Sequence, residues 1–185
     1  MTTRRLAVYT FGNFIRPSEH PANQGFHDRN DPNFQAVERA EGFLARSGYD
    51  DEPGPESWGE QVYPRFYIEL GDGWAPSTLS LWEDLSSIMA FAYAGIHAEA
   101  MRHGREWFIK PEWPPYALWW VEAGHTPSWA EATKRHEFLH DNGPSAHVFD
   151  FKQPFDERGE PTAIDRDAMK RKAARNAETL RRLIP

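Results

Sequence analysis

The sequence has no cysteine, no long apolar run and no surplus of positive charge, and each absence removes a class of protein. Without cysteine the chain forms no disulfide, binds no metal through thiolates and has no cysteine nucleophile. The 28 Asp and Glu outnumber the 21 Lys and Arg, for a formal net charge of -7. We therefore expect neither nucleic acid nor an anionic membrane surface as a partner.

Apolar stretches are short throughout the chain. None approaches the ~18 residues that a membrane-spanning helix requires. The first, Leu6 to Phe11, is too short for the core of a signal peptide, and no small-residue cleavage site follows it. These features predict a cytoplasmic protein.

Aromatic residues are abundant, at 14% of the chain with 8 Trp, although the mean hydropathy is -0.74. This combination fits an aromatic-lined cavity, and it fits equally a core built from Trp and Phe. A chain of 185 residues suits one domain. We predict an α+β domain over residues 1–160 and a helical extension of the same domain over residues 161–185.

Strand and helix signals alternate along the chain. Asp31 and Pro32 predict the start of a helix that Gly48 ends, and the residues 12–30 before it predict a long loop that is a candidate lid. Ser128 and Glu131 form a capping box at the start of another helix. The other predicted elements are strands at 6–11, 63–70, 78–82, 116–121 and 146–151 and helices at 85–104 and 165–184.

This order predicts a ferredoxin-like antiparallel sheet with helices on one face and an extra C-terminal helix. Alternation along residues 63–70 places Phe66, Ile68 and Leu70 toward the helices, together with Leu79 and Leu81 of the next strand. The opposite, mixed face then carries the polar and aromatic side chains Tyr9, Phe11, Tyr63, Arg65, Tyr67, Glu69, Thr78, Ser80 and Trp82.

The segment from Tyr116 to Val121 is apolar on both faces, with Trp119 and Trp120 pointing opposite ways. Both faces of this strand must therefore be covered. A second copy of the sheet would do so in a homodimeric α+β barrel, because closed symmetric dimers are common. The alternative is a cover formed by the long loop and the C-terminal helix of the same chain.

Four stretches carry a resemblance to a known family. They are SGYDDEPGPESWGEQVYPRFY (47–67), LSLWEDLSSIMAFAYAGIHAEAMRHGREWF (79–108), PYALWWVEAGHTPSWAEA (115–132) and LHDNGP (139–144). Together they resemble the bacterial family catalogued as domain of unknown function 3291, which is grouped with the dimeric α+β barrels and their antibiotic-biosynthesis monooxygenases. Residues 81–97 are also similar to spheroidene-monooxygenase-type sequences. The resemblance implies a barrel dimer and no particular reaction.

Two histidines are candidates for proton transfer. His97 lies at the margin of an apolar helix stripe, where it can act as a base or an axial haem ligand, or simply be a hydrogen-bonded residue at the edge of the core. His125 lies in a loop after a buried strand, a common location for functional residues, although its side chain could instead merely cap the helix that follows.

A third pattern, His136-Glu137-Phe138-Leu139-His140, matches the H-E-x-x-H motif of zinc peptidases. Asn142 and Gly143 end the helix at once, and a catalytic zinc needs a third protein ligand that the sequence does not identify. We interpret the match as coincidental and predict no metal.

The sequence favours a cavity that binds a small, partly aromatic organic molecule. Tyr9, Arg65 and Tyr67 would orient this molecule. Its apolar walls would come from the tryptophans Trp82, Trp107 and Trp119. His97 or His125 would transfer protons in a monooxygenase-like oxidation or an isomerisation. The alternatives are a non-catalytic binding protein and a haem-binding enzyme, and no cofactor is firmly implied.

Overall fold

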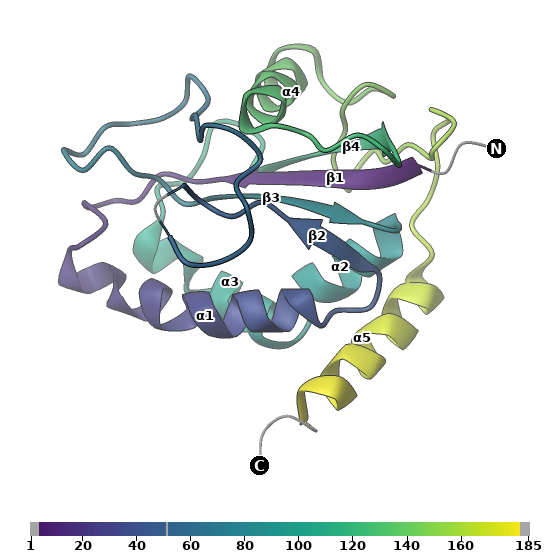
Figure 1. The fold of residues 1–185 in the computed structure, drawn as a ribbon, viewed down its shortest axis with the longest axis horizontal. Coiled ribbons are helices and arrows are strands. Elements are labelled where there is room, and N and C mark those ends of the chain that lie inside the picture. Colours follow the sequence, from purple (N-terminus) through teal and green to yellow (C-terminus); the bar gives the residue numbers. More distant parts are fainter. Residues whose placement is uncertain (1–3, 51, 182–185) are drawn as a thin grey trace.

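The computed structural model describes residues 4–50 and 52–181. It contains one antiparallel sheet in the order β2-β3-β1-β4, with helices on both of its faces (Figure 1). The strands are β1 (Arg4–Phe11), β2 (Phe43–Arg46), β3 (Ser77–Trp82) and β4 (Tyr116–Glu122). The helices are the short η1 (Pro21–Asn23), then α1 (Gln24–Glu38), α2 (Leu85–Ala92), α3 (Gly95–Trp107), α4 (Trp129–Asn142) and α5 (Arg166–Arg181). The fold class is therefore α+β, as the sequence predicts.

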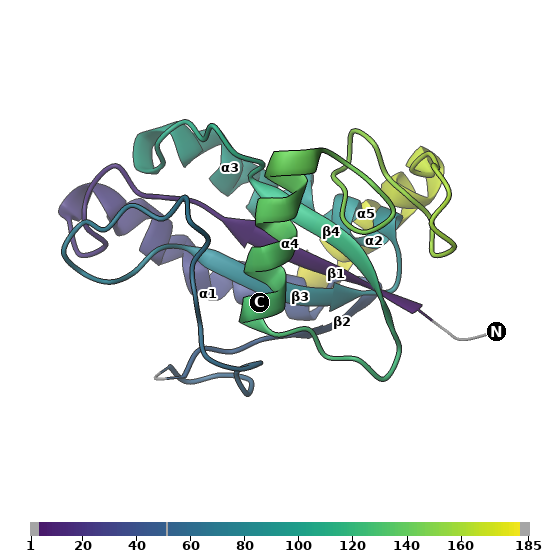
Figure 2. The same cartoon turned by 90° about the horizontal axis from the view of Figure 1, so that it is seen from above.

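The two faces of the sheet bury separate cores. On one face, α1 and α2 pack their apolar side chains on Leu6, Val8 and Trp82. On the other face, α4 packs on Tyr9 and Leu79. Figure 1 shows α4 above the sheet and α1, α2 and α3 below it, and Figure 2 shows α4 crossing over the strands. Residues directly opposite in neighbouring strands share a face, so the pairing of Tyr9 with Leu79 places both under α4.

The capping signals correctly predict α4. Ser128 Oγ accepts a hydrogen bond from the backbone N–H of Glu131 at 3.1 Å, and the N–H of Gly143 donates to the carbonyl of Leu139 at 2.9 Å. With both ends fixed, the helix presents Trp129 and His136 to the sheet, since seven residues make about two turns.

The predicted strand over residues 63–70 is wrong. This segment makes a turn in which the N–H of Tyr67 donates to the carbonyl of Pro64 at 2.9 Å. The buried side chain of Asn13 holds the segment instead of a neighbouring strand. Its Nδ2 donates to the carbonyl of Phe66 at 2.8 Å, and its Oδ1 accepts from the N–H of Ile68 at 3.1 Å. We call residues 61–70 the strap, because they cross over the α4 face of the sheet.

The strand that replaces it in the sheet is β2, in a segment that the sequence predicts as the end of a helix. The helix in fact ends at Glu38, and Gly42 turns the chain into β2 with a φ of 78°. A Cβ at this position would lie 2.1 Å from Ser87 Oγ, so both the turn and the close contact require glycine.

Other predicted boundaries also differ. The helix α1 begins at Gln24, inside the predicted 12–30 loop, and carries Pro32 within it. The predicted 85–104 helix is two helices, α2 and α3, because Gly95 breaks it with a φ of 58°. The predicted 146–151 strand makes only isolated bridges, among them Phe149 to Leu118.

The predicted assignment of side chains to the two faces is wrong in part. Leu79 and Leu81 share the α4 face with Tyr9, whereas Trp82 lies on the α1 and α2 face. Trp119 and Trp120 do point to opposite faces, as predicted. The error has a simple cause, since the register between β1 and β3 is not visible in either strand alone.

Burial of β4 on both faces is confirmed, but α4 and the strap of the same chain provide the cover. Trp119 is 0% exposed beneath them, and the 12–30 region and α5 lie elsewhere. The expected Trp-rich surface patch does not exist, so it supplies no reason for a second copy of the sheet.

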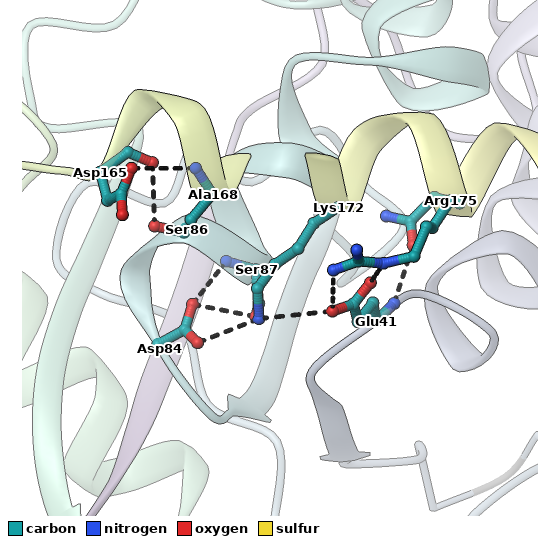
Figure 3. A network of polar contacts seen from close by, with 9 residues as sticks. Glu41, Asp84, Ser86, Ser87, Asp165, Ala168, Lys172 and Arg175 are labelled. Atoms are coloured by element: carbon teal, nitrogen blue, oxygen red, sulfur yellow. Dashed lines mark hydrogen bonds and ion pairs between the residues drawn. The ribbon is translucent and has the colours of Figure 1, made fainter. Parts of the chain in front are cut away.

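Polar contacts attach α5 to the start of α2 and to the turn before β2 (Figure 3). Lys172 Nζ lies 3.0 Å from Asp84 Oδ2 and 2.7 Å from Ser87 Oγ, and Arg175 pairs with Glu41. Burial opposes ionisation of Asp84, but hydrogen bonds from Ser87 and Lys172 still leave its pKa below the usual value. The C-terminal helix α5 therefore packs on α2. No helix in the described part of the chain has the length and apolarity to cross a membrane.

Candidate functional site

An aromatic shell lies between the sheet and α4, and we call it the α4-side cluster. It consists of Tyr9 from β1, Phe66 from the strap, Trp113 from the segment before β4, and Trp129 and His136 from α4. The ring centroid of His136 is 5.4 Å from that of Tyr9 and 5.5 Å from that of Phe66. The histidine is therefore central to the cluster.

Four polar atoms of this cluster are buried without a hydrogen-bond partner. They are Tyr9 Oη, Trp113 Nε1, Trp129 Nε1 and His136 Nδ1. Only two other side-chain atoms among the described residues share this condition, and both belong to amides whose other end is bonded. Each buried polar group without a partner costs about 1–3 kcal/mol, so four in one place call for a physical explanation.

The protonation of His136 follows from its one bonded nitrogen. Nε2 is in hydrogen-bond contact with the carbonyl oxygen of Pro114, which only accepts, so Nε2 carries the proton. Burial lowers the pKa of His136, against the opposing effect of the Pro114 contact, and the ring is neutral at pH 7. Nδ1 is therefore a free acceptor.

Tyr9 has the complementary role. Burial raises the pKa of Tyr9 well above its usual value, and the nearby Tyr63 and Glu137 raise it further. Its hydroxyl thus stays protonated and can donate, as can the two indole N–H groups of Trp113 and Trp129. The cluster offers three donors and one acceptor, and none of its five side chains is charged.

Charged residues stand at the rim of the cluster and pair with one another. Glu137 Oε1 accepts from the N–H of Arg65 at 2.7 Å, and the Arg65 guanidinium binds Asp141. This hydrogen bond, with a contact from His140, lowers the pKa of Asp141 to about 2. Both partners are half-exposed, so the pair adds little stability.

The two histidines of the H-E-x-x-H match have different surroundings. His136 is buried against Pro114, whereas His140 lies at the surface with Nδ1 at 3.0 Å from Asp141 Oδ1. In the described ranges, no group of three or more His, Asp or Glu is placed to hold a metal ion.

The structure does not bring the predicted substrate-binding residues into one cavity. Tyr9 and Trp119 lie on the α4 face, whereas Trp82 lies on the opposite face. Trp107 lies at the end of α3 against Phe26. Arg65 points outward to the rim, and Tyr67 stacks on Tyr63 and donates to Glu69 at 2.8 Å.

The predicted catalytic histidines are also apart. His97 packs on Phe91 and contacts the carbonyl of Ala92 at 2.9 Å through Nδ1, and burial lowers the pKa of this histidine. Phe91 also contacts Trp82, so His97 belongs to the α1 and α2 side. His125 is exposed, with Nε2 at 2.6 Å from Glu131 Oε2, and Glu131 also accepts from Trp119 Nε1 at 3.0 Å.

An open hollow approaches the α4-side cluster from outside. It has a volume of about 200 Å³ and lies between α1 and residues 46–53. Tyr49 lines this hollow, and its ring stacks on Trp129 at a centroid distance of 5.7 Å. Tyr49 therefore lies between the hollow and Trp129.

Sequence reasoning missed His136, Trp113 and Trp129 as site residues. A signal for two of them was present, because Trp129, Ala132, His136 and Leu139 form one helical stripe and the histidine stands in its middle. A titratable group on an apolar stripe is a candidate for function.

Comparisons with known proteins place the chain in a family. The sequence matches the family described as Domain of unknown function (DUF3291) over residues 5–165. No curated protein matches it significantly. A solved structure, the NE2512 protein of unknown function from Nitrosomonas europaea, is 12% identical, with a TM-score of 0.40 over 69% of this chain and 96% of that one. This likeness is too low to support an argument. The match over residues 5–165 covers most of the sequence, and the chain therefore belongs to the DUF3291 family.

Proposed function

We propose that the chain binds a small organic molecule at the α4-side cluster. The observation that carries the proposal is the group of four partnerless polar atoms inside one aromatic shell. Binding sites for small molecules are mostly apolar, with a few polar groups that fix orientation. A ligand that pairs with these atoms would recover the free energy lost by burying them.

The strap is the element that can open this site. It has no regular secondary structure, and its ring of Phe66 stacks on Trp113 at a centroid distance of 5.5 Å and an interplanar angle of 5°. Its polar attachments are the Asn13 side chain, the backbone N–H of Arg65 on Glu137 and the half-exposed ion pair of Arg65. Its side chains Val62, Tyr63, Phe66 and Tyr67 also pack on the core. None of these contacts is a backbone hydrogen bond of the sheet, so the strap can open while the strands stay paired.

Binding without turnover is the function that these groups favour. An isomerisation would require Tyr9 to give up a proton and His136 to accept one. Burial raises the pKa of Tyr9 and lowers that of His136, so it opposes both charged forms. The chain is accordingly proposed as a binding protein rather than as a monooxygenase-like enzyme.

Haem binding has less support. The hollow bordered by Phe91 and Ile96, next to His97, has a volume of about 60 Å³. Ligand pockets usually measure roughly 300–1,000 Å³. The contact of His97 Nδ1 with a backbone carbonyl leaves Nε2 available to a metal, as in many ligating histidines, so the small volume of the hollow is the observation against haem.

The architecture that we propose around this site is ferredoxin-like. The element order β1-α1-β2-β3-α2-β4 and the strand order β2-β3-β1-β4 support it, with α3, α4 and α5 as additions. A barrel dimer joined sheet to sheet would require α4 to leave the sheet, so the proposed site lies within one chain. Sedimentation at micromolar concentration tests this, because a barrel dimer predicts twice the mass of 21.4 kDa.

Indole signals in ¹H–¹⁵N spectra test the binding proposal. We expect fragments that bind to shift the indole N–H signals of Trp113 and Trp129. The control is Trp82, whose N–H donates to Ser80 Oγ at 3.0 Å on the other face of the sheet and should not move. If no fragment of a broad library moves the first two signals, or a crystal structure shows ordered water on all four atoms, the proposal is wrong.

A further inference from the structure

The hydrogen-bonding pattern of the α4-side cluster limits the chemistry of its ligand. Indole N–H groups only donate, so Trp113 and Trp129 require acceptors. His136 Nδ1 has a lone pair and requires a donor, because Nε2 already holds the ring proton toward Pro114. The matching ligand carries a strong acceptor such as a carbonyl oxygen beside an N–H or O–H donor.

The charge of the ligand is limited as well. The cluster itself contains no ionised side chain, and the Arg65 guanidinium at the rim is already paired with Asp141 and, at 4.0 Å, with Glu137. An ion would thus lose its hydration without meeting a free counter-ion, which is costly in an apolar interior. An uncharged ligand avoids this cost.

The shape of the ligand follows from Phe66. Its ring lies parallel to Trp113 and edge-on to His136, at an interplanar angle of 85°. It belongs to the strap, whereas His136 belongs to α4 and Trp113 belongs to the segment that leads into β4. When the strap moves outward, the space that it leaves is a flat slot beside the indole face of Trp113 and the imidazole ring of His136. A planar aromatic ring fits this slot.

We infer that the ligand is an uncharged aromatic amide, whose ring takes the place of Phe66 while its carbonyl accepts from the Trp or Tyr9 donors and its N–H donates to His136 Nδ1. This inference rests on the proposed function and names its ligand class. Phe66 then acts as an internal plug that competes with the ligand.

Three small probes separate the elements of this inference. Benzamide is uncharged and has both an acceptor and a donor, methyl benzoate is uncharged without a donor, and benzoate is an anion without a donor. Isothermal titration should show that benzamide binds Phe66→Ala at least about tenfold more tightly than it binds the unaltered protein, because the plug is removed. The Phe66→Ala variant should also bind benzamide about tenfold more tightly than it binds methyl benzoate or benzoate.

The control is Ile68→Ala, in which an exposed side chain of the same strap is shortened and benzamide affinity should not change. Phe66→Leu repeats the experiment with a smaller loss of packing if Phe66→Ala does not fold. Equal or tighter binding of benzoate, or equal affinities of the Phe66 and Ile68 variants, would overturn the amide inference. In those cases any probe that shifts the Trp113 and Trp129 signals still supports the site itself. If no probe shifts them, the amide inference is wrong, and the site also fails if no fragment of the broad library shifts them.

Discussion

The two faces of the sheet bury similar aromatic side chains but differ in how their indole N–H groups are hydrogen-bonded. Facing α1 and α2, Trp82 donates to Ser80 Oγ at 3.0 Å and Trp120 donates to the carbonyl of Phe155 at 2.8 Å. Facing α4, the indoles of Trp113 and Trp129 donate to nothing. Trp119, which also lies on the α4 face, donates to Glu131 Oε1 at 3.0 Å, so the unpaired indoles belong to the α4-side cluster and not to the whole face. A local group of unpaired atoms is what the proposed binding site requires.

The largest difference between the faces should appear when a ring is removed. Phe149 is fully buried on the α1 and α2 face, and Phe149→Ala should cost about 3–5 kcal/mol of unfolding free energy. Phe66 is half-buried on the strap, so Phe66→Ala should cost clearly less. Urea denaturation of both variants measures the difference. Equal losses would mean that the strap is part of the rigid core.

A polar contact on the α1 and α2 side should give the next largest effect. The side chain of Lys172 is 13% exposed and binds Asp84 and Ser87, so Lys172→Ala should cost about 1–3 kcal/mol by leaving these partners unpaired. Lys170→Ala, an exposed change on the same helix, is the control and should cost under about 0.5 kcal/mol. If the two variants unfold at the same urea concentration, α5 is not held by this network.

Acid should lower the unfolding free energy of the protein by protonating His136, which is buried on the α4 face. Its folded pKa lies below the unfolded value near 6.5, so the unfolded state binds more protons in the range between them. The stability is fully present above about pH 6.5 and is lost as the pH falls toward the folded pKa, at no more than about 1.4 kcal/mol per pH unit.

The contribution of His136 can be measured by comparing the unfolding free energy at pH 7.5 and pH 5.5 in the unaltered chain and in His136→Phe. His136→Phe should reduce the loss of stability between these two pH values relative to the unaltered chain, while the contributions of His97 and His147, whose pKa values are also lowered, remain. An unchanged pH dependence would show that His136 is already free to protonate in the folded protein.

The sequence predicts the elements whose signals are local. The first strand, β3, β4 and α4 each carry an alternation or a capping box of their own. It fails where the deciding contact is distant in the chain. Residues 63–70 alternate like a strand, but Asn13 and a turn at Pro64 hold them away from the sheet. Leu44 continues a helical stripe, yet Gly42 and its contact with Ser87 place it in β2.

The same limit applies to the candidate site. The position of His136 on the apolar stripe of α4 is readable in the sequence, but its tautomer depends on Pro114, which lies 22 positions earlier. The missing partner of Tyr9 depends on three segments that meet only in the folded chain. Residue types and spacing predict a binding site on the sheet, but they do not show which buried atoms are unpaired.

The smallest expected change in stability comes from removing one hydroxyl group. Tyr9 and Thr10 allow a direct comparison of the two faces, because they are neighbours on opposite faces of β1. Thr10 Oγ1 is 2.6 Å from Thr78 Oγ1, so Thr10→Val should cost about 1 kcal/mol by leaving Thr78 without its partner. Tyr9→Phe removes a hydroxyl that has no partner, and it should leave the unfolding free energy unchanged or slightly raised. The same Tyr9→Phe change should weaken the binding of benzamide to the Phe66→Ala background, since the donor is lost only from the bound state. A loss of stability in Tyr9→Phe as large as that in Thr10→Val would mean that the Tyr9 hydroxyl is already bonded in the free protein, and the contrast between the two faces would disappear.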